Sequence, residues 1–106
     1  MRGLYHTPWS DEVDLLSFAD NQDPEGYGAE PVRRRTLFCN WEEGVSQNEF
    51  YLSNKQGLQA TDSVELQRVD YEGERFAEFE GRRYRVVRSF PASFDTITLI
   101  LSEVVR

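Results

Sequence analysis

Short runs of β-branched, aromatic and alternating apolar residues recur along this chain, and Gly, Pro, Asn or Asp bound most of them. Such runs predict strands, because alternate side chains of a strand point to opposite faces and the bounding residues favour turns. The runs cover residues 13–18, 32–41, 63–70, 75–79, 83–90 and 96–105. The last run is apolar on both faces near its middle, which predicts a central strand. We therefore expect a mainly β fold of five or six strands, either a small SH3-like or OB-like barrel or a sandwich.

One segment, SQNEFYLSNKQGL at residues 46–58, breaks the strand pattern. Ser46 and Glu49 have the spacing of a helix capping box, and Gly57 supplies a left-handed stop. The pattern predicts a short helical or flexible insertion between the second and third strands. An isolated helix of about two and a half turns is marginal, so this segment could change conformation when a partner packs on it.

The length of 106 residues allows one domain, spanning residues 1–106, with a single core. No run of about 18 apolar residues is present, and the N-terminus has no apolar stretch of a secretory signal, so we expect neither a membrane span nor export. Cys39 is the only cysteine, so it cannot form an internal disulfide. That composition fits a reducing cytoplasm.

The charge of the chain is acidic and unevenly distributed. The net charge is -7, with 19 acidic and 12 basic residues. Residues 1–31 hold seven acids and one base, and the loop that we expect at residues 19–31 carries much of this excess. Tight nucleic-acid binding usually needs a basic face that displaces counterions from phosphates. The composition therefore disfavours a DNA-binding role.

The residue types that carry most enzyme chemistry are scarce. His6 is the only histidine and lies far along the chain from Cys39, so a nucleophile–base pair is not indicated. The acids at Asp20, Asp23 and Glu25 lack the glycine and the terminal glutamate of a calcium loop, and clustered zinc ligands and a P-loop are missing. We therefore expect no enzyme, no catalytic residue, no cofactor and no metal site.

Arginines and aromatic residues are the remaining candidates for binding. A run at 33–35 is joined later in the chain by four more arginines: Arg82, Arg83, Arg85 and Arg88. Alternate residues of a strand face opposite sides, so the run favours pairing with acids of neighbouring strands over one continuous patch. Phe50 and Tyr51 could either cap the core or anchor a neighbouring subunit.

From Phe38 onward, the ordered motifs resemble the head-closure proteins of long-tailed bacteriophages and prophages, also called head–tail adaptors or connector stoppers. The motifs run FCN, SQNEFYLSNKQGLQ, VDYEGERFAEFEGRRYRVVRSF and a Leu-rich last strand that ends in SEVV. The residues that carry the resemblance are Glu49, Phe50, Tyr51, Gly57, Leu58, Tyr71, Gly73, Glu74, Gly81, Tyr84, Arg88 and Ser89.

The resemblance implies a structural role in the virion, at the interface of head and tail, after assembly in the bacterial cytoplasm. Proteins of this family are small β-barrels that assemble as a ring of about twelve copies beneath the portal and its adaptor, and that close the DNA exit channel. Their partners are the portal and adaptor rings, the tail proteins and other copies of themselves, whereas the free protein is a monomer. Double-stranded DNA passes through the ring without specific binding.

The resemblance also implies roles for particular residues. The segment that enters the channel corresponds to residues 42–62. Subunit contacts and channel closure are expected of Ser46, Glu49, Phe50, Tyr51, Gly57 and Leu58, and a tail- or ring-contact surface of Arg82, Arg83, Arg85 and Arg88.

Two other functions remain open from the residues alone. The first is a small β-barrel that binds single-stranded nucleic acid, which requires the arginines of both groups to share one face. The second is a tail-side joining protein of the same fold.

Overall fold

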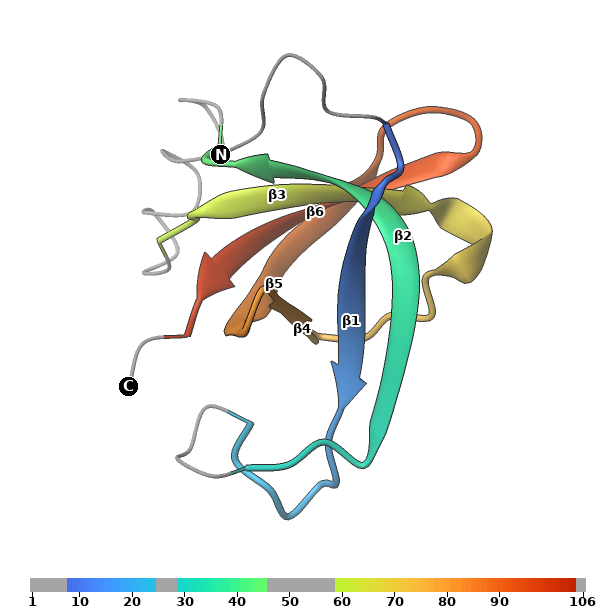
Figure 1. The fold of residues 1–106 in the computed structure, drawn as a ribbon. Coiled ribbons are helices and arrows are strands. Elements are labelled where there is room, and N and C mark those ends of the chain that lie inside the picture. Colours follow the sequence, from blue (N-terminus) through green and yellow to red (C-terminus); the bar gives the residue numbers. More distant parts are fainter. Residues whose placement is uncertain (1–7, 25–28, 46–58, 105–106) are drawn as a thin grey trace.

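A computed structural model describes residues 8–24, 29–45 and 59–104 of the chain. Six strands form a closed antiparallel barrel in the order β1-β2-β3-β6-β5-β4 (Figure 1). The strands are β1 (Asp11–Ser17), β2 (Arg33–Glu43), β3 (Asp62–Gln67), β4 (Phe76–Phe79), β5 (Arg82–Pro91) and β6 (Thr96–Glu103). The predicted fold class, a small β-barrel of five or six strands, is confirmed.

β2 is long enough to pair with two neighbouring strands over successive parts of its length, and this helps the barrel to close. Its first seven residues pair with β1, from Arg33 opposite Ser17 to Cys39 opposite Asp11. Its last four residues pair with β3, ending with Glu43 opposite Asp62. β1 then pairs with the short strand β4 on its other side, so no strand of the described barrel is left with an unpaired edge.

Alternating side chains fill the interior of the barrel, as the strand pattern predicts. The buried core residues come from all six strands: Val13, Leu15, Cys39, Trp41, Val64, Leu66, Ala77, Phe79, Tyr84, Leu99 and Leu101. Burying a large apolar side chain contributes about 1.5–3 kcal/mol, so these residues supply the main stabilising term. In β6 the outward-facing Ile100 is buried as well, which agrees with the predicted two-sided burial of this strand.

Most strand boundaries differ from the predicted ones by one or two residues. The largest difference lies after β3, where the predicted strand continues to Asp70 but the observed one ends at Gln67. Residues Arg68–Asp70 form a 3-10 turn, η1, instead. The amide of Arg68 donates to the carbonyl of Asp95 at 2.8 Å, so this turn is held against the β5–β6 hairpin rather than against a neighbouring strand.

The predicted hairpin between β4 and β5 is confirmed as a two-residue turn. Phe79 pairs with Arg82, and both residues between them have positive φ, 51° at Glu80 and 80° at Gly81. Two positive φ values in succession define the turn whose twist matches the flanking strands. Glycine adopts this conformation without strain, whereas Glu80 adopts it at a cost.

Within the three described ranges, no helix is long and apolar enough to cross a membrane. The predicted helix at residues 46–58 lies outside these ranges.

Candidate functional site

The β2–β3 connection is the part of the chain that we expect to close a channel. The six residues assigned to it lie outside the described residues: Ser46, Glu49, Phe50, Tyr51, Gly57 and Leu58. The predicted span of 42–62 overlaps the strands at both ends, because β2 continues to Glu43 and β3 begins at Asp62. The connection itself therefore comprises residues 44–61.

Both ends of this connection are fixed to the barrel. The amide of Gly44 donates to Oδ1 of Asp62 at 3.1 Å, directly after the last β2–β3 pair. On the returning side Ala60 is buried, and the amide of Thr61 donates to the carbonyl of Leu101 at 2.8 Å. The connection consequently leaves and re-enters the barrel at adjacent strand ends on one rim.

Three aromatic rings pack together at the same rim and close the barrel interior. The rings of Trp41 and Phe79 are parallel, with centroids 3.9 Å apart, and Tyr84 meets Trp41 edge-on at 5.0 Å. Burial raises the pKa of Tyr84 to about 12, and the negative charges of Asp62 and Glu103 add to this shift. The phenol therefore stays neutral throughout the physiological range.

A hollow of about 350 Å³ lies over these rings, and acidic side chains surround it. Of the residues that the structure describes, Glu43, Asp62 and Glu80 line it together with one base, Arg82. Several carboxylates around one concave surface give a negative potential that repels phosphate.

Three arginines of β5 pack on aromatic rings along the barrel wall, whereas the fourth, Arg82, lies at the rim. Arg83, Arg85 and Arg88 lie over the rings of Phe18, Phe76 and Phe90, with guanidinium-to-centroid distances of 5.1, 5.8 and 5.1 Å respectively. Arg82 is instead exposed at the rim, 3.8 Å from Glu103. Cation–π contacts of this kind hold the arginine side chains along the barrel wall.

Arg83 also binds the backbone of the acidic loop at residues 19–31. Its Nη1 donates to the carbonyls of Pro24 and Ala29 at 3.2 and 3.1 Å. The predicted loop between β1 and β2 is confirmed in its described parts, and Gln22 braces it by donating to the carbonyl of Glu30 at 2.8 Å. The guanidinium of Arg83 is thus engaged within its own chain.

The arginine run at 33–35 is neutralised by acids, as the alternation of β2 predicts. Arg34 faces outward, and its Nη1 donates to Asp14 at 2.6 Å and to Glu78 at 2.7 Å. These hydrogen bonds, with Glu78 the larger contributor, raise the pKa of Arg34. Arg33 and Arg35 point the other way, toward the β3–β4 connection, so the run does not present one basic patch.

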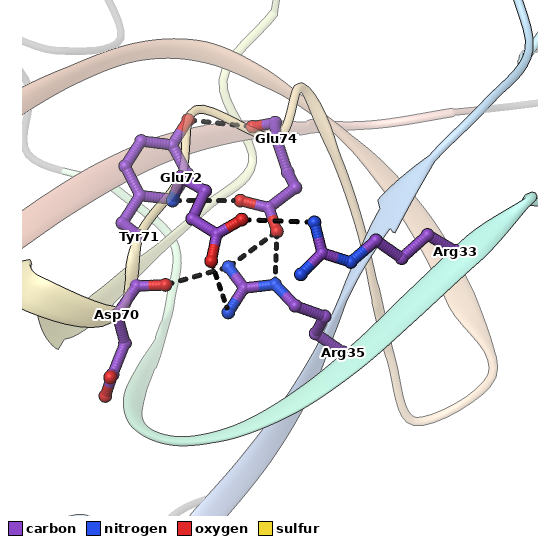
Figure 2. A network of polar contacts seen from close by, with 6 residues as sticks. All are labelled: Arg33, Arg35, Asp70, Tyr71, Glu72 and Glu74. Atoms are coloured by element: carbon purple, nitrogen blue, oxygen red, sulfur yellow. Dashed lines mark hydrogen bonds and ion pairs between the residues drawn. The ribbon is translucent and has the colours of Figure 1, made fainter.

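A buried carboxylate organises that connection (Figure 2). Oε2 of Glu74 accepts from Nε of Arg35 at 2.6 Å, and its Oε1 accepts from the amide of Glu72 at 3.1 Å. Arg35 also donates to the carbonyl of Asp70, and Tyr71 donates through its hydroxyl to the carbonyl of Glu74. Burial, then the charge of Glu74, raises the pKa of Tyr71. The network fixes the path of the chain between η1 and β4.

The sequence offers one cysteine and one histidine as reactive side chains, and the structure describes only the cysteine. Cys39 is a fully buried side chain of β2, as we expect of a small core residue, and His6 lies outside the described ranges. Residues 8–24, 29–45 and 59–104 contain no group of three or more His, Cys, Asp or Glu that could hold a metal ion.

Exposed apolar side chains are the feature that the sequence patterns miss. Among the described residues, four large hydrophobic side chains are exposed: Val32, Phe38, Val69 and Phe94. The sequence pattern predicts exposure only for Phe38, because this residue alternates with the inward-facing Leu37 and Cys39 of β2. Val69 lies in a segment that the pattern assigns to a strand, and Phe94 in a turn whose orientation depends on the tertiary structure.

Neither a scan against protein-family models nor a search of curated proteins finds a match to this chain. The resemblance to head-closure proteins therefore depends on the ordered motifs from Phe38 onward.

Proposed function

We propose that this chain is a structural protein of a phage or prophage particle that joins head to tail and closes the DNA exit channel as an oligomeric ring. The observation that carries the proposal is that both ends of the β2–β3 connection are attached to paired strand ends of the barrel. It departs from Glu43 and returns at Asp62, which are paired neighbours on one rim of a closed barrel. A long insertion on a rigid frame can be presented identically by every copy in a ring.

The electrostatics of the same rim support a conduit rather than a DNA-binding surface. Glu43, Asp62 and Glu80 surround the hollow beside the connection. A wall with this charge repels phosphate, so double-stranded DNA passes without being held. The portal and adaptor rings, the tail and further copies of the chain are the proposed partners, and the virion head–tail interface is the proposed location.

The test is to delete the insertion while keeping the barrel that carries it. Deleting residues 46–58 leaves five residues between Glu43 and Asp62, which is within the usual range for a β-hairpin loop. The expected product is a folded barrel that still docks on portal–adaptor particles but lets packaged DNA leak. Nuclease-accessible DNA per particle is the measurement, with a Gly/Ser linker of equal length at 46–58 as the matched control.

Each result of this experiment has a defined meaning. Leakage with both variants assigns channel closure to the side chains of the insertion, and leakage with the deletion alone assigns it to the length of the segment. Full DNA retention with both variants contradicts the proposal, as does a failure of the intact chain to bind portal–adaptor particles. Binding to tail-tube protein instead identifies the tail-side joining protein.

A single-stranded nucleic-acid-binding barrel is the alternative, and the arginine contacts argue against it. Arg34 is engaged by Asp14 and Glu78, and Arg35 by the buried Glu74. A stacking platform with a basic groove would need these groups available to phosphate. Salt-sensitive binding of a labelled oligonucleotide near physiological ionic strength would favour this alternative.

A further inference from the structure

Two exposed apolar side chains lie in neighbouring elements at one end of the barrel, Val69 in η1 and Phe94 in the β5–β6 hairpin. Phe94 is 97% exposed and Val69 is 86% exposed, the highest values among the large hydrophobic side chains of the described residues. Their elements are joined, because the amide of Arg68 donates to the carbonyl of Asp95 at 2.8 Å. We refer to Val69 and Phe94 together as the Phe94 knob.

The backbone that carries the knob is well braced. The hydroxyls of Ser93 and Thr96 lie 2.7 Å apart, and the amide of Ala92 donates to the carbonyl of Thr96 at 3.1 Å. Single exposed apolar residues are ordinary on protein surfaces. A phenylalanine that is almost fully exposed on a hydrogen-bonded turn, next to an element that exposes a second apolar side chain, is instead arranged like an interface anchor.

An apolar pocket lies elsewhere on the barrel, where the start of the acidic loop passes β1 and β4. It has a volume of about 260 Å³, and its apolar lining includes Leu16, Phe18, Pro24 and Phe76. Phe18 and Phe76 pack edge to face with centroids 5.5 Å apart. A benzene ring fits a cavity of about 150 Å³, so this pocket, defined here as the Leu16 pocket, is large enough for a phenylalanine side chain.

The knob and the pocket belong to different regions of the molecule. In Figure 1 the β5–β6 hairpin lies at the upper right, whereas the loop that follows β1 lies at the bottom. Because Phe94 is almost fully exposed, it does not occupy the pocket of its own chain. Arg75 is exposed and lines the pocket, as does Glu74, whose buried carboxylate is already paired with Arg35. Asp95 is exposed beside the knob, so Arg75 and Asp95 are available as an opposite-charge pair across a contact.

We infer that the Phe94 knob of one copy inserts into the Leu16 pocket of a second copy. The contact is heterologous, because it joins two different patches, and a repeated heterologous contact produces a closed ring when its rotation closes. The inference rests on the proposed function in one respect: it names the contact by which neighbouring copies of that ring meet.

The first experiment is a dilution series of the intact chain observed by two-dimensional NMR. One aromatic anchor with one ion pair gives weak association, so concentrations from about 20 µM to about 1 mM are required. We expect concentration-dependent shifts at both Phe94 and Phe76, the two sides of the contact. Shifts at the knob alone indicate a symmetric contact between two knobs and overturn the inference, as does a complete absence of shifts at either site.

The second experiment tests the pairing with two complementary variants. Phe94→Ser removes the knob and leaves the pocket, whereas Ala19→Trp fills the pocket and leaves the knob. Each variant alone should associate more than about tenfold more weakly than the intact chain. A mixture of the two should form one-to-one pairs and nothing larger, by sedimentation velocity. A mixture that stays monomeric overturns the inference.

A charge exchange keeps the test valid if Ala19→Trp disturbs the fold. Arg75→Asp and Asp95→Arg both alter exposed positions, so each variant should fold, and each alone should weaken association. The double variant should restore it, because the two charges have exchanged places; no restoration counts against the contact.

The contact and the proposed function can fail separately. Normal ring formation by Phe94→Ser on portal–adaptor particles overturns the contact and leaves the function standing. A chain that associates through the knob and the pocket but neither docks on such particles nor retains DNA overturns the function and leaves the contact standing.

Discussion

Arg35 and Glu74 form an ion pair with a 2.6 Å nitrogen–oxygen distance, and the carboxylate side chain is only 4% exposed. A carboxylate so removed from water is stable only while its partners remain in place. The pair joins β2 to the β3–β4 connection, so it links two parts of the chain that are 39 residues apart.

Removing Arg35 should therefore be strongly destabilising. We expect Arg35→Met to lower the free energy of unfolding by about 3–5 kcal/mol, because the charge of Glu74 is left buried without its partner. Urea unfolding followed by tryptophan fluorescence measures this change. Arg33→Met is the matched control, since Arg33 pairs with Glu72 where both side chains are more than half exposed, and it should cost less than about 1 kcal/mol. Equal effects of the two substitutions would show that Glu74 does not depend on Arg35.

Tyr84 should make stability fall at high pH. Its pKa is about 12 in the folded protein and about 10 in an unfolded chain. The folded state thus keeps its proton after the unfolded state has lost it, so the contribution of Tyr84 is complete below about pH 10 and is lost between about pH 10 and 12. Thermal unfolding across this range measures the decline. Tyr84→Phe should flatten it, and a decline that is unchanged in Tyr84→Phe would assign it to another group.

The β4–β5 turn should tolerate few residues at Gly81. This position has a φ of +80° and open space around a potential Cβ, so the penalty for a side chain comes from the backbone alone. We expect Gly81→Ala to destabilise the fold by about 1–2 kcal/mol. Gly81→Asn is the control, and should cost less because asparagine adopts this conformation more readily. Equal chemical-denaturation midpoints for all three proteins would contradict this account of the turn.

Arg83 should control the acidic loop more than the barrel. Arg83→Met removes both hydrogen bonds to Pro24 and Ala29, so we expect faster proteolysis within residues 19–31. Arg82→Met removes an arginine that is 68% exposed and should leave the proteolysis rate unchanged. Limited proteolysis with mass spectrometry gives the cleavage sites. Equal cleavage rates in the two variants would mean that Arg83 does not anchor the loop.

Much of the fold is encoded locally, and the sequence by itself determined it. The alternation of Val64 and Leu66 with polar residues identifies β3 and its inward face, because the side-chain period of a strand depends only on the strand itself. The same rule predicts that Arg34 faces away from Arg33 and Arg35. The turn at Gly81 is also local, since its conformation depends on two adjacent residues.

Only the tertiary structure decided which distant segments meet. The closure of β1 on β4, the burial of Glu74 beneath Arg35 and the capture of Pro24 by Arg83 join residues that lie far apart in the sequence. Phe94 and Phe90 illustrate the same limit, because they lie in one hairpin yet Phe94 is almost fully exposed while Phe90 is covered in part. Pairing and burial depend on the surfaces that other strands supply, and no local pattern contains that information.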